Sequence, residues 1–246
     1  SVDCRYHARN RRRILDSRVD STRVLGEAIE NCEAPPPAWL NSSTATIYRH
    51  SFDKPMDEAT GEIGGSPEAK DEFSVAVAVA WEKAFDDAIT PGARKVALRS
   101  AMVLGEGRNS VFPVLRRLAR LGLGGKMASG RQFVSWIHES DFCRAIEWLL
   151  ENESVSGVVN LAAPNPLPNR EMMGILRRIC RAPFGVGIPA PLALLELGAF
   201  VLRTETELIV KSRRVVPGRL EAAGFPFEFT RFEDAAREIE ARISMI

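Results

Sequence analysis

WLNSSTATIY, residues 39–48, begins as an apolar strand and ends in a run of hydroxyl side chains followed by a tyrosine. In open parallel sheets, ligands bind in the crevice at the carboxyl ends of the strands, where side chains leave the core. Hydroxyl groups at such a strand end can donate and accept hydrogen bonds around a carbonyl or a sugar hydroxyl. Ser and Thr also satisfy the local backbone at strand ends. The stretch alone therefore favours a ligand site and a structural cap equally.

Strand and helix patterns alternate around this stretch. Helical spacing of apolar residues predicts helices over 11–32 and 73–85, and apolar runs predict strands over 38–47 and 95–104. Two strand and helix repeats in this order indicate a parallel sheet with helices packed on both of its faces. The predicted fold class is α/β, with a doubly wound parallel sheet.

The second half of the chain predicts a smaller, mixed and mainly helical lobe. Further helices and strands are expected at residues 110–121, 132–137, 141–150 and 157–162. Asn169 is a candidate N-cap of the helix that follows. We place the domain boundary after residue 105, so that 1–105 form the sheet domain and 106–246 form the lobe, although later strands can return to the sheet.

Composition excludes several classes of protein. The 33 Lys and Arg residues nearly balance the 32 Asp and Glu residues, so the charge gives no reason to expect nucleic acid or an anionic membrane as a partner. No apolar run approaches the roughly 20 residues of a membrane span. The four cysteines form no CxxC pair, which indicates reduced thiols and a cytoplasmic protein.

Several motifs in order resemble one protein family. SSTATIY (42–48) resembles the SSSATVY segment of the extended short-chain dehydrogenases/reductases, the superfamily of nucleotide-sugar epimerases and dehydratases. LRSAMVLGEG (98–107) is similar to the strand LRxxNVYGPxG of that superfamily, and Asp141 in GRQFVSWIHESDFCRAI (130–146) lies at the position of its aspartate. FSVAVAVAWEKAF (73–85) resembles, more narrowly, the atypical NAD-dependent epimerase/dehydratase branch called epimerase family protein with a C-terminal domain of unknown function.

This resemblance implies a Rossmann-like sheet that binds NADP or NAD together with a small-molecule substrate. Thr44 matches the Ser or Thr that positions the substrate carbonyl in the superfamily. The resemblance also implies that the cofactor contacts lie along two strand ends, at Ser42, Ser43, Ala101, Met102 and Val103.

Two departures from the family pattern limit the activity that is expected. A complete member carries a GxxGxxG turn after its first strand, but this sequence has no glycine before Gly26. The cluster at Gly105 and Gly107 and the cluster at residues 122–125 do not follow an opening strand. We therefore expect either an N-terminally shortened chain or a chain that has lost its main contact with the cofactor, and in both cases weak or absent cofactor binding. We also expect the strand at 38–47 to be an exposed sheet edge through which the protein self-associates.

The second departure concerns the catalytic pair. The superfamily reaction uses a tyrosine phenol as acid or base, and a lysine four residues later lowers its pKa. Phe73 and Val77 occupy these two positions, and the only tyrosines in the chain are Tyr6 and Tyr48. Hydride chemistry with the usual pair is therefore excluded if this alignment holds.

Other side chains could supply the missing chemistry, and each has a structural alternative. The phenol of Tyr48 is near Thr44 in the sequence, but its ring could simply cover the strand end. An imidazole can exchange protons near neutral pH, yet a single histidine such as His138 is more often packed. Arg99 and Gln132 could orient a ligand, although Arg99 could equally pair with a carboxylate. Trp136 could stack on a ligand or pack in the core.

Three functions remain open at this point. The first is an NAD(P)-dependent epimerase or reductase-like enzyme with an unidentified acid or base. The second is a non-catalytic protein that binds a dinucleotide, which the loss of the phenol and lysine favours. The third is an interaction protein that uses the sheet edge.

Overall fold

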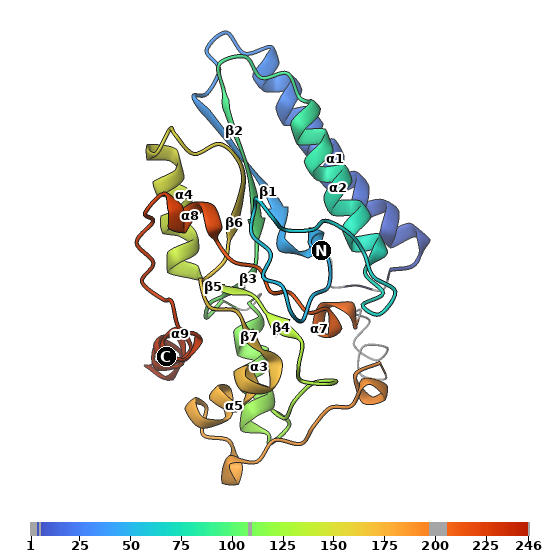
Figure 1. Cartoon of the computed structure of the whole chain (residues 1–246), viewed down its shortest axis with the longest axis vertical. Coiled ribbons are helices and arrows are strands. Elements are labelled where there is room, and N and C mark those ends of the chain that lie inside the picture. Colours follow the sequence, from blue (N-terminus) through green and yellow to red (C-terminus); the bar gives the residue numbers. More distant parts are fainter. Residues whose placement is uncertain (1–3, 5, 108–109, 197–205, 246) are drawn as a thin grey trace.

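The computed structural model describes residues 4, 6–107, 110–196 and 206–245. Figure 1 shows two regions, one around a parallel sheet and one built mainly of helices. The sheet has the strand order β1-β2-β6, and both pairings are parallel. Its strands are β1 (Ala38–Thr44), β2 (Arg94–Ser100) and β6 (Gly157–Leu161). The predicted α/β class with a parallel sheet is confirmed.

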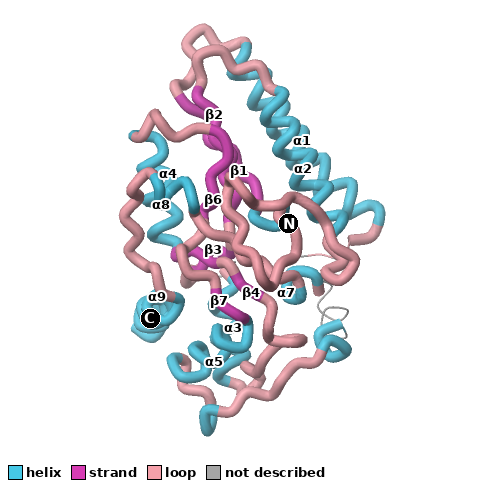
Figure 2. Tube along the Cα trace, in the orientation of Figure 1, coloured by secondary structure: helices cyan, strands magenta, loops and turns pink. Residues whose placement is uncertain are grey.

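Helices cover both faces of this sheet (Figures 1 and 2). On one face lie α1 (Ala8–Glu30) and α2 (Glu72–Asp87), and on the other lie α4 (Glu139–Glu151) and α8 (Gly218–Ala222). Successive side chains of a strand point to opposite faces, and β2 follows this rule. Ala97 packs with Trp39 and Phe85 on the α2 face, while Val96 and Leu98 pack in the cluster that includes α4.

The strand predicted over 95–104 is two strands in the structure. β2 ends at Ser100, and β3 (Met102–Leu104) pairs with β5 (Trp136–His138) in a separate two-stranded sheet. Between them the Ala101 amide donates to the Leu161 carbonyl at 2.9 Å, and the Met102 amide donates to the Ser135 carbonyl at 3.2 Å. The chain therefore changes partner strand at Ala101, which the strand-like pattern of residues 95–104 could not reveal.

The strand predicted over 38–47 is also shorter than expected. It ends at Thr44, whose hydroxyl accepts the Thr46 amide at 3.1 Å and so caps the 3-10 helix η1 (Ala45–Ile47). Within the described residues β1 pairs with β2 alone, so β1 is an edge strand as predicted.

The helical region packs around a second core. Its helices are α3 (Val111–Arg120), α5 (Asn169–Ile179) and α9 (Phe232–Met245), beside an antiparallel pair of β4 (Phe133–Val134) and β7 (Leu167–Pro168). Two short elements, η2 (Pro183–Gly185) and α7 (Glu207–Val210), follow α5.

Two details of this region differ from the sequence predictions. The strand expected over 132–137 is split into β4 and β5. The N-cap of α5 is Pro168, not Asn169, because the Asn169 side chain instead accepts the Met127 amide at 2.8 Å. β6 lies beyond residue 105 and returns to the main sheet, while the domain boundary itself stays a prediction.

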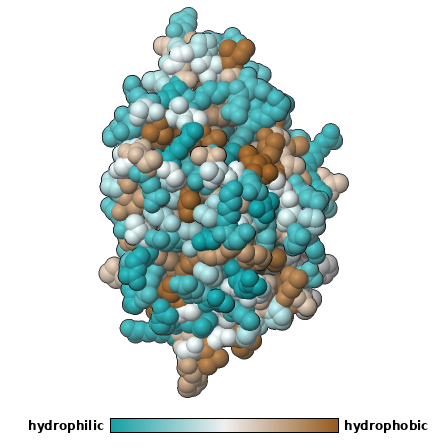
Figure 3. All heavy atoms as spheres, viewed as in Figure 1, coloured by the Kyte–Doolittle hydropathy of each residue, from teal (hydrophilic) through white to brown (hydrophobic). Residues whose placement is uncertain are grey.

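The described residues include no helix that is long and apolar enough to cross a membrane. The face in Figure 3 is mostly hydrophilic, with small separated hydrophobic patches.

Candidate functional site

The hydroxyl groups at the end of β1 have different environments. Ser42 is exposed, whereas Ser43 is buried and donates its hydroxyl to Glu82 of α2 at 2.5 Å. Thr44 is half-buried, and its oxygen caps η1. In the described chain no acceptor lies within hydrogen-bond reach of the Thr44 O–H, so this hydroxyl can still donate to a ligand.

Arg99 is held by a carboxylate of the neighbouring helix. Its Nε and one terminal nitrogen donate to Glu82 at 2.8 and 2.6 Å, and only 5% of Arg99 and 8% of Glu82 is exposed. Such a two-point contact fixes a guanidinium strongly. The pairing that the sequence left open for Arg99 is therefore present, and its partner is Glu82.

Tyr48 lies over the same guanidinium. Arg99 is 4.8 Å from the centre of the Tyr48 ring, and the buried phenol donates to Asn160 at 3.0 Å. Burial raises the pKa of Tyr48 above its usual value, although Arg99 acts in the opposite direction. The phenol thus stays protonated near neutral pH and already has an acceptor.

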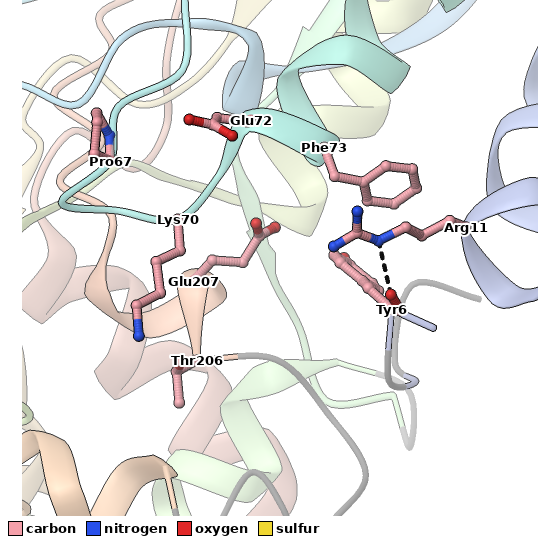
Figure 4. Close-up of a pocket in the computed structure, with 8 residues that line it drawn as sticks. All are labelled: Tyr6, Arg11, Pro67, Lys70, Glu72, Phe73, Thr206 and Glu207. Atoms are coloured by element: carbon pink, nitrogen blue, oxygen red, sulfur yellow. Dashed lines mark hydrogen bonds between the residues drawn. The ribbon is translucent and has the colours of Figure 1, made fainter. Parts of the chain in front are cut away.

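A cavity of about 720 Å³ opens at the start of α2, and we name it the α2 cavity. Figure 4 shows Tyr6, Arg11 and Phe73 together on one side of it, and Lys70 and Glu207 further across. The Tyr6 and Phe73 rings meet edge to face at 5.1 Å, and the Arg11 guanidinium lies 5.0 Å from the Phe73 ring. Phe73 thus presents a ring without an exchangeable proton to this cavity.

Four charged side chains gather between the α2 cavity and η1, and we name them the buried charge cluster: Asp71, Glu207, Lys211 and Arg213. Lys211 and Asp71 are fully buried and in direct contact. Lys211 also donates to the Thr46 carbonyl at 2.6 Å, and Arg213 donates to the Thr46 hydroxyl at 3.3 Å. The segment after α7 therefore holds η1 in place.

Burial affects the ionisation of this cluster. It lowers the pKa of Lys211, which the contact with Asp71 opposes, and it raises the pKa of Glu207, which the Ser74 hydroxyl opposes. Since each buried charge has a partner of opposite sign, the cluster can remain ionised. No local pattern in the sequence indicates the buried charge cluster, because its members meet only after folding.

A second cavity, of about 830 Å³, lies beside the loop that follows β1. We name it the β1-loop cavity. Residues 49–53 form part of its wall, and another part is formed by Ala128, Ser129, Gln132, Pro191 and Leu192. Gln132 is in this wall but only 1% exposed, and its amide donates to the Met127 carbonyl at 2.9 Å.

The remaining predicted site residues lie near β3 and β5. The Trp136 indole is buried and donates to the Asn165 carbonyl at 3.1 Å. His138 is 2% exposed, contacts Glu238 at 2.9 Å through Nε2 and caps α4 through Nδ1. Both side chains therefore have structural partners. Ala101, Met102 and Val103 are half-buried where the chain crosses from β2 to β3.

Comparison with known proteins places the chain in a family. A family model described as "Domain of unknown function (DUF1731)" matches residues 190–239. The mouse (Mus musculus) epimerase family protein SDR39U1 is 31% identical over 240 residues, which are 96% of this chain and 77% of that protein. Epimerase family protein YfhF of Bacillus subtilis is 28% identical, over 98% of this chain and 75% of that protein.

Solved structures agree with these relatives. The crystal structure of human epimerase family protein SDR39U1 (isoform 2) with NADPH superposes with a TM-score of 0.83 at 29% identity, over 96% of this chain and 76% of the other. A nucleoside-diphosphate sugar epimerase from Corynebacterium glutamicum gives 0.73 at 26% identity, over 96% of this chain and 44% of the other. The parallel sheet, with helices on both of its faces, makes this chain a Rossmann-like α/β protein. The chain belongs to the epimerase family proteins that include SDR39U1.

The glycine clusters at 105–107 and 122–125 are the places in this sequence where the phosphates of a dinucleotide could lie against the backbone. A phosphate needs open space against glycine backbone, but a Cβ on Gly105 would lie 1.8 Å from the Glu139 carboxylate, and one on Gly125 would lie 2.3 Å from the Ile188 carbonyl. Protein atoms already occupy both places. A pyrophosphate therefore does not fit beside Gly105 or Gly125, whereas the space beside Gly107 and Gly122 is open.

Proposed function

We propose that the chain is an NAD(P)-dependent epimerase- or reductase-like protein that holds the nicotinamide half of its cofactor at the carboxyl ends of β1 and β2. The observation that carries this proposal is the similarity, at a TM-score of 0.83, to a human relative solved with NADPH. Ligands of open parallel sheets bind at these strand ends.

The residues proposed to hold the nicotinamide half are Thr44 and the backbone of 101–103. When bound, this group supplies hydride chemistry. The Thr44 oxygen accepts the Thr46 amide, so the Thr44 O–H is left to donate to a ligand oxygen. Asp71 and Lys211 keep η1 fixed through the Thr46 carbonyl, which preorganises this donor.

The acid or base of such a reaction is unassigned, and this supports a second candidate function. Phe73 carries no exchangeable proton, Val77 is a buried apolar side chain, and the phenol of Tyr48 donates to Asn160. A protein that binds a nicotinamide cofactor without turning over a substrate would fit these three observations.

Fluorescence titration tests the binding proposal. Because a pyrophosphate does not fit beside Gly105 or Gly125, NADPH and reduced nicotinamide mononucleotide should bind weakly and within about threefold of each other. Thr44→Val should weaken both by about fivefold, the loss of one hydrogen bond. Thr230→Val is the control, because Thr230 is exposed and far along the chain from the site.

Two results would reject this arrangement. If neither ligand binds, the proposed function is wrong. If NADPH binds more than tenfold tighter than the mononucleotide, the chain has a site that binds the pyrophosphate. A reduced-cofactor absorbance assay with carbonyl substrates then separates the two candidate functions, because turnover requires an acid or base and binding does not.

The edge of β1 supports a third proposal, self-association through that edge. Unpaired strand edges add further strands unless a charge blocks them. Sedimentation velocity should show a concentration-dependent larger species that Ser42→Lys suppresses and Ser21→Lys, on exposed α1 surface, does not. Equal behaviour of both variants would reject the edge as the interface.

A further inference from the structure

His50 lies in the wall of the β1-loop cavity with one ring nitrogen engaged. Its Nδ1 accepts the Ser212 amide at 3.0 Å. A ring nitrogen that accepts a hydrogen bond carries no proton, so a neutral imidazole in this position has its proton on Nε2. Throughout the described ranges, no group hydrogen-bonds this Nε2. His50 therefore carries an unengaged N–H donor on a residue that lines the cavity.

The surroundings of His50 favour the neutral ring. Burial lowers its pKa; Asp71 and Glu68 oppose this change, and Lys211 and Arg49 add to it. Protonation would also place a proton on Nδ1 against the Ser212 N–H, so that two donors would face each other. Both effects keep the imidazole uncharged near pH 7.

Packing fixes the direction of the ring. His50 meets Phe52 edge to face, with ring centres 4.7 Å apart. Ser212 is itself held, because its hydroxyl donates to the Ser51 carbonyl at 2.6 Å and accepts the Phe133 amide at 2.9 Å. A donor held this way is preorganised and needs little reorganisation when a ligand binds.

The other charged groups of the wall are mostly paired. The Arg49 guanidinium contacts Glu62 at 2.8 Å, and Asp53 accepts the Ser51 hydroxyl and the Lys54 amide. Glu68 adds a carboxylate to the lining, which disfavours an anionic ligand. A neutral ligand suits this balance of charge.

The same wall offers apolar surface. Phe52 is 41% exposed and Leu192 is 44% exposed, and both line the cavity. Small-molecule sites commonly combine such apolar surface with a few directed polar groups. An apolar body beside one hydrogen-bond acceptor would match both features.

We infer that the β1-loop cavity binds a neutral carbonyl compound, whose oxygen accepts a hydrogen bond from Nε2–H of His50 and whose apolar part packs on Phe52 and Leu192. His50 polarises the carbonyl and transfers no proton, since a neutral imidazole that lost Nε2–H would become an unfavourable anion. The inference adds a substrate class to the proposed function and rests on it for any role in turnover, but binding at this cavity requires no cofactor.

Nuclear magnetic resonance on ¹⁵N-labelled protein tests the inference without NADPH. Long-range ¹H–¹⁵N spectra at pH 7 should show His50 as the neutral Nε2–H form, and acetophenone, a neutral aryl ketone, should shift that resonance. His50→Phe should weaken acetophenone binding about five- to tenfold, the loss of one hydrogen bond. His50→Gln retains an amide donor and should stay within about threefold of the unmodified protein. His7→Phe, at an exposed position, is the control.

Each alternative result overturns the inference. The inference fails if the spectra show the proton of His50 on Nδ1. It also fails if His50→Phe binds acetophenone as tightly as the unmodified protein does, or if the unmodified protein binds benzoate more tightly than acetophenone. Failure of the proposed function is distinguishable, because it appears as loss of NADPH binding while acetophenone still shifts His50.

Discussion

Replacing Glu82 by Gln should lower the free energy of unfolding by about 3–5 kcal/mol, the usual cost of breaking a buried ion pair. The Glu82 carboxylate accepts two hydrogen bonds from Arg99, at 2.8 and 2.6 Å, and one from Ser43 at 2.5 Å. A glutamine amide presents one oxygen and no charge, so the buried Arg99 loses its counter-ion. For a chain of 246 residues this cost corresponds to a fall in Tm of about 6–20 °C.

Chemical and thermal denaturation followed by circular dichroism measure this loss, and the same helix provides a control. Lys83 contacts Asp87 at 2.8 Å, with both side chains more than 60% exposed, so Lys83→Met should cost less than about 1 kcal/mol. The double variant Glu82→Leu with Arg99→Met removes both charges and should recover most of the stability. The reasoning fails if Glu82→Gln costs no more than Lys83→Met, or if the double variant loses as much stability as the single variants Glu82→Leu and Arg99→Met lose together.

Three further predictions follow from buried groups. Lys211→Met leaves Asp71 without its counter-ion and should cost about 3–5 kcal/mol in equilibrium denaturation; adding Asp71→Asn should restore part of that loss, and no restoration would contradict the pairing. Burial raises the pKa of Tyr48 in the folded chain, so the contribution of the phenol to stability is complete below the unfolded pKa and is lost as pH rises through the folded pKa. Above about pH 10 the free energy of unfolding should therefore decrease more steeply with pH in the unmodified protein than in Tyr48→Phe. Parallel curves for the two proteins would contradict the buried position of the phenol. Burial, aided by the charge of Glu240, raises the pKa of Cys180 to about 12, so at pH 8 a disulfide reagent should label exposed Cys32 rapidly and Cys180 only after unfolding, as mass spectrometry of the labelled peptides can determine.

The layered fold could be predicted from the sequence because its signals are local. Apolar runs mark β1 and β2, and helical spacing marks α1 and α2, whatever their partners are. The break at Ala101 could not be predicted, since apolar residues lie on both sides of Arg99 and Ser100 and only the positions of β5 and β6 decide which strand each half joins.

The candidate site shows the same division. The sequence identified the hydroxyl-rich end of β1, but it could not choose between roles for its residues. Arg99 could orient a ligand or pair with a carboxylate, and only the packing of α2 against the sheet brings Glu82 to it. His50 had no signal of its own, because its significance depends on an amide donated from Ser212, far along the chain.

The contact of Lys211 with Asp71 joins the region matched by the family model to the part of the chain that carries the sheet. That region, residues 190–239, contributes an interior cation to the sheet half of the molecule. A protein expressed without it would expose the stretch that begins at Thr44 and would leave Asp71 without its counter-ion Lys211. The "domain of unknown function" is therefore not a separable module: it completes the folding unit whose strand ends it supports.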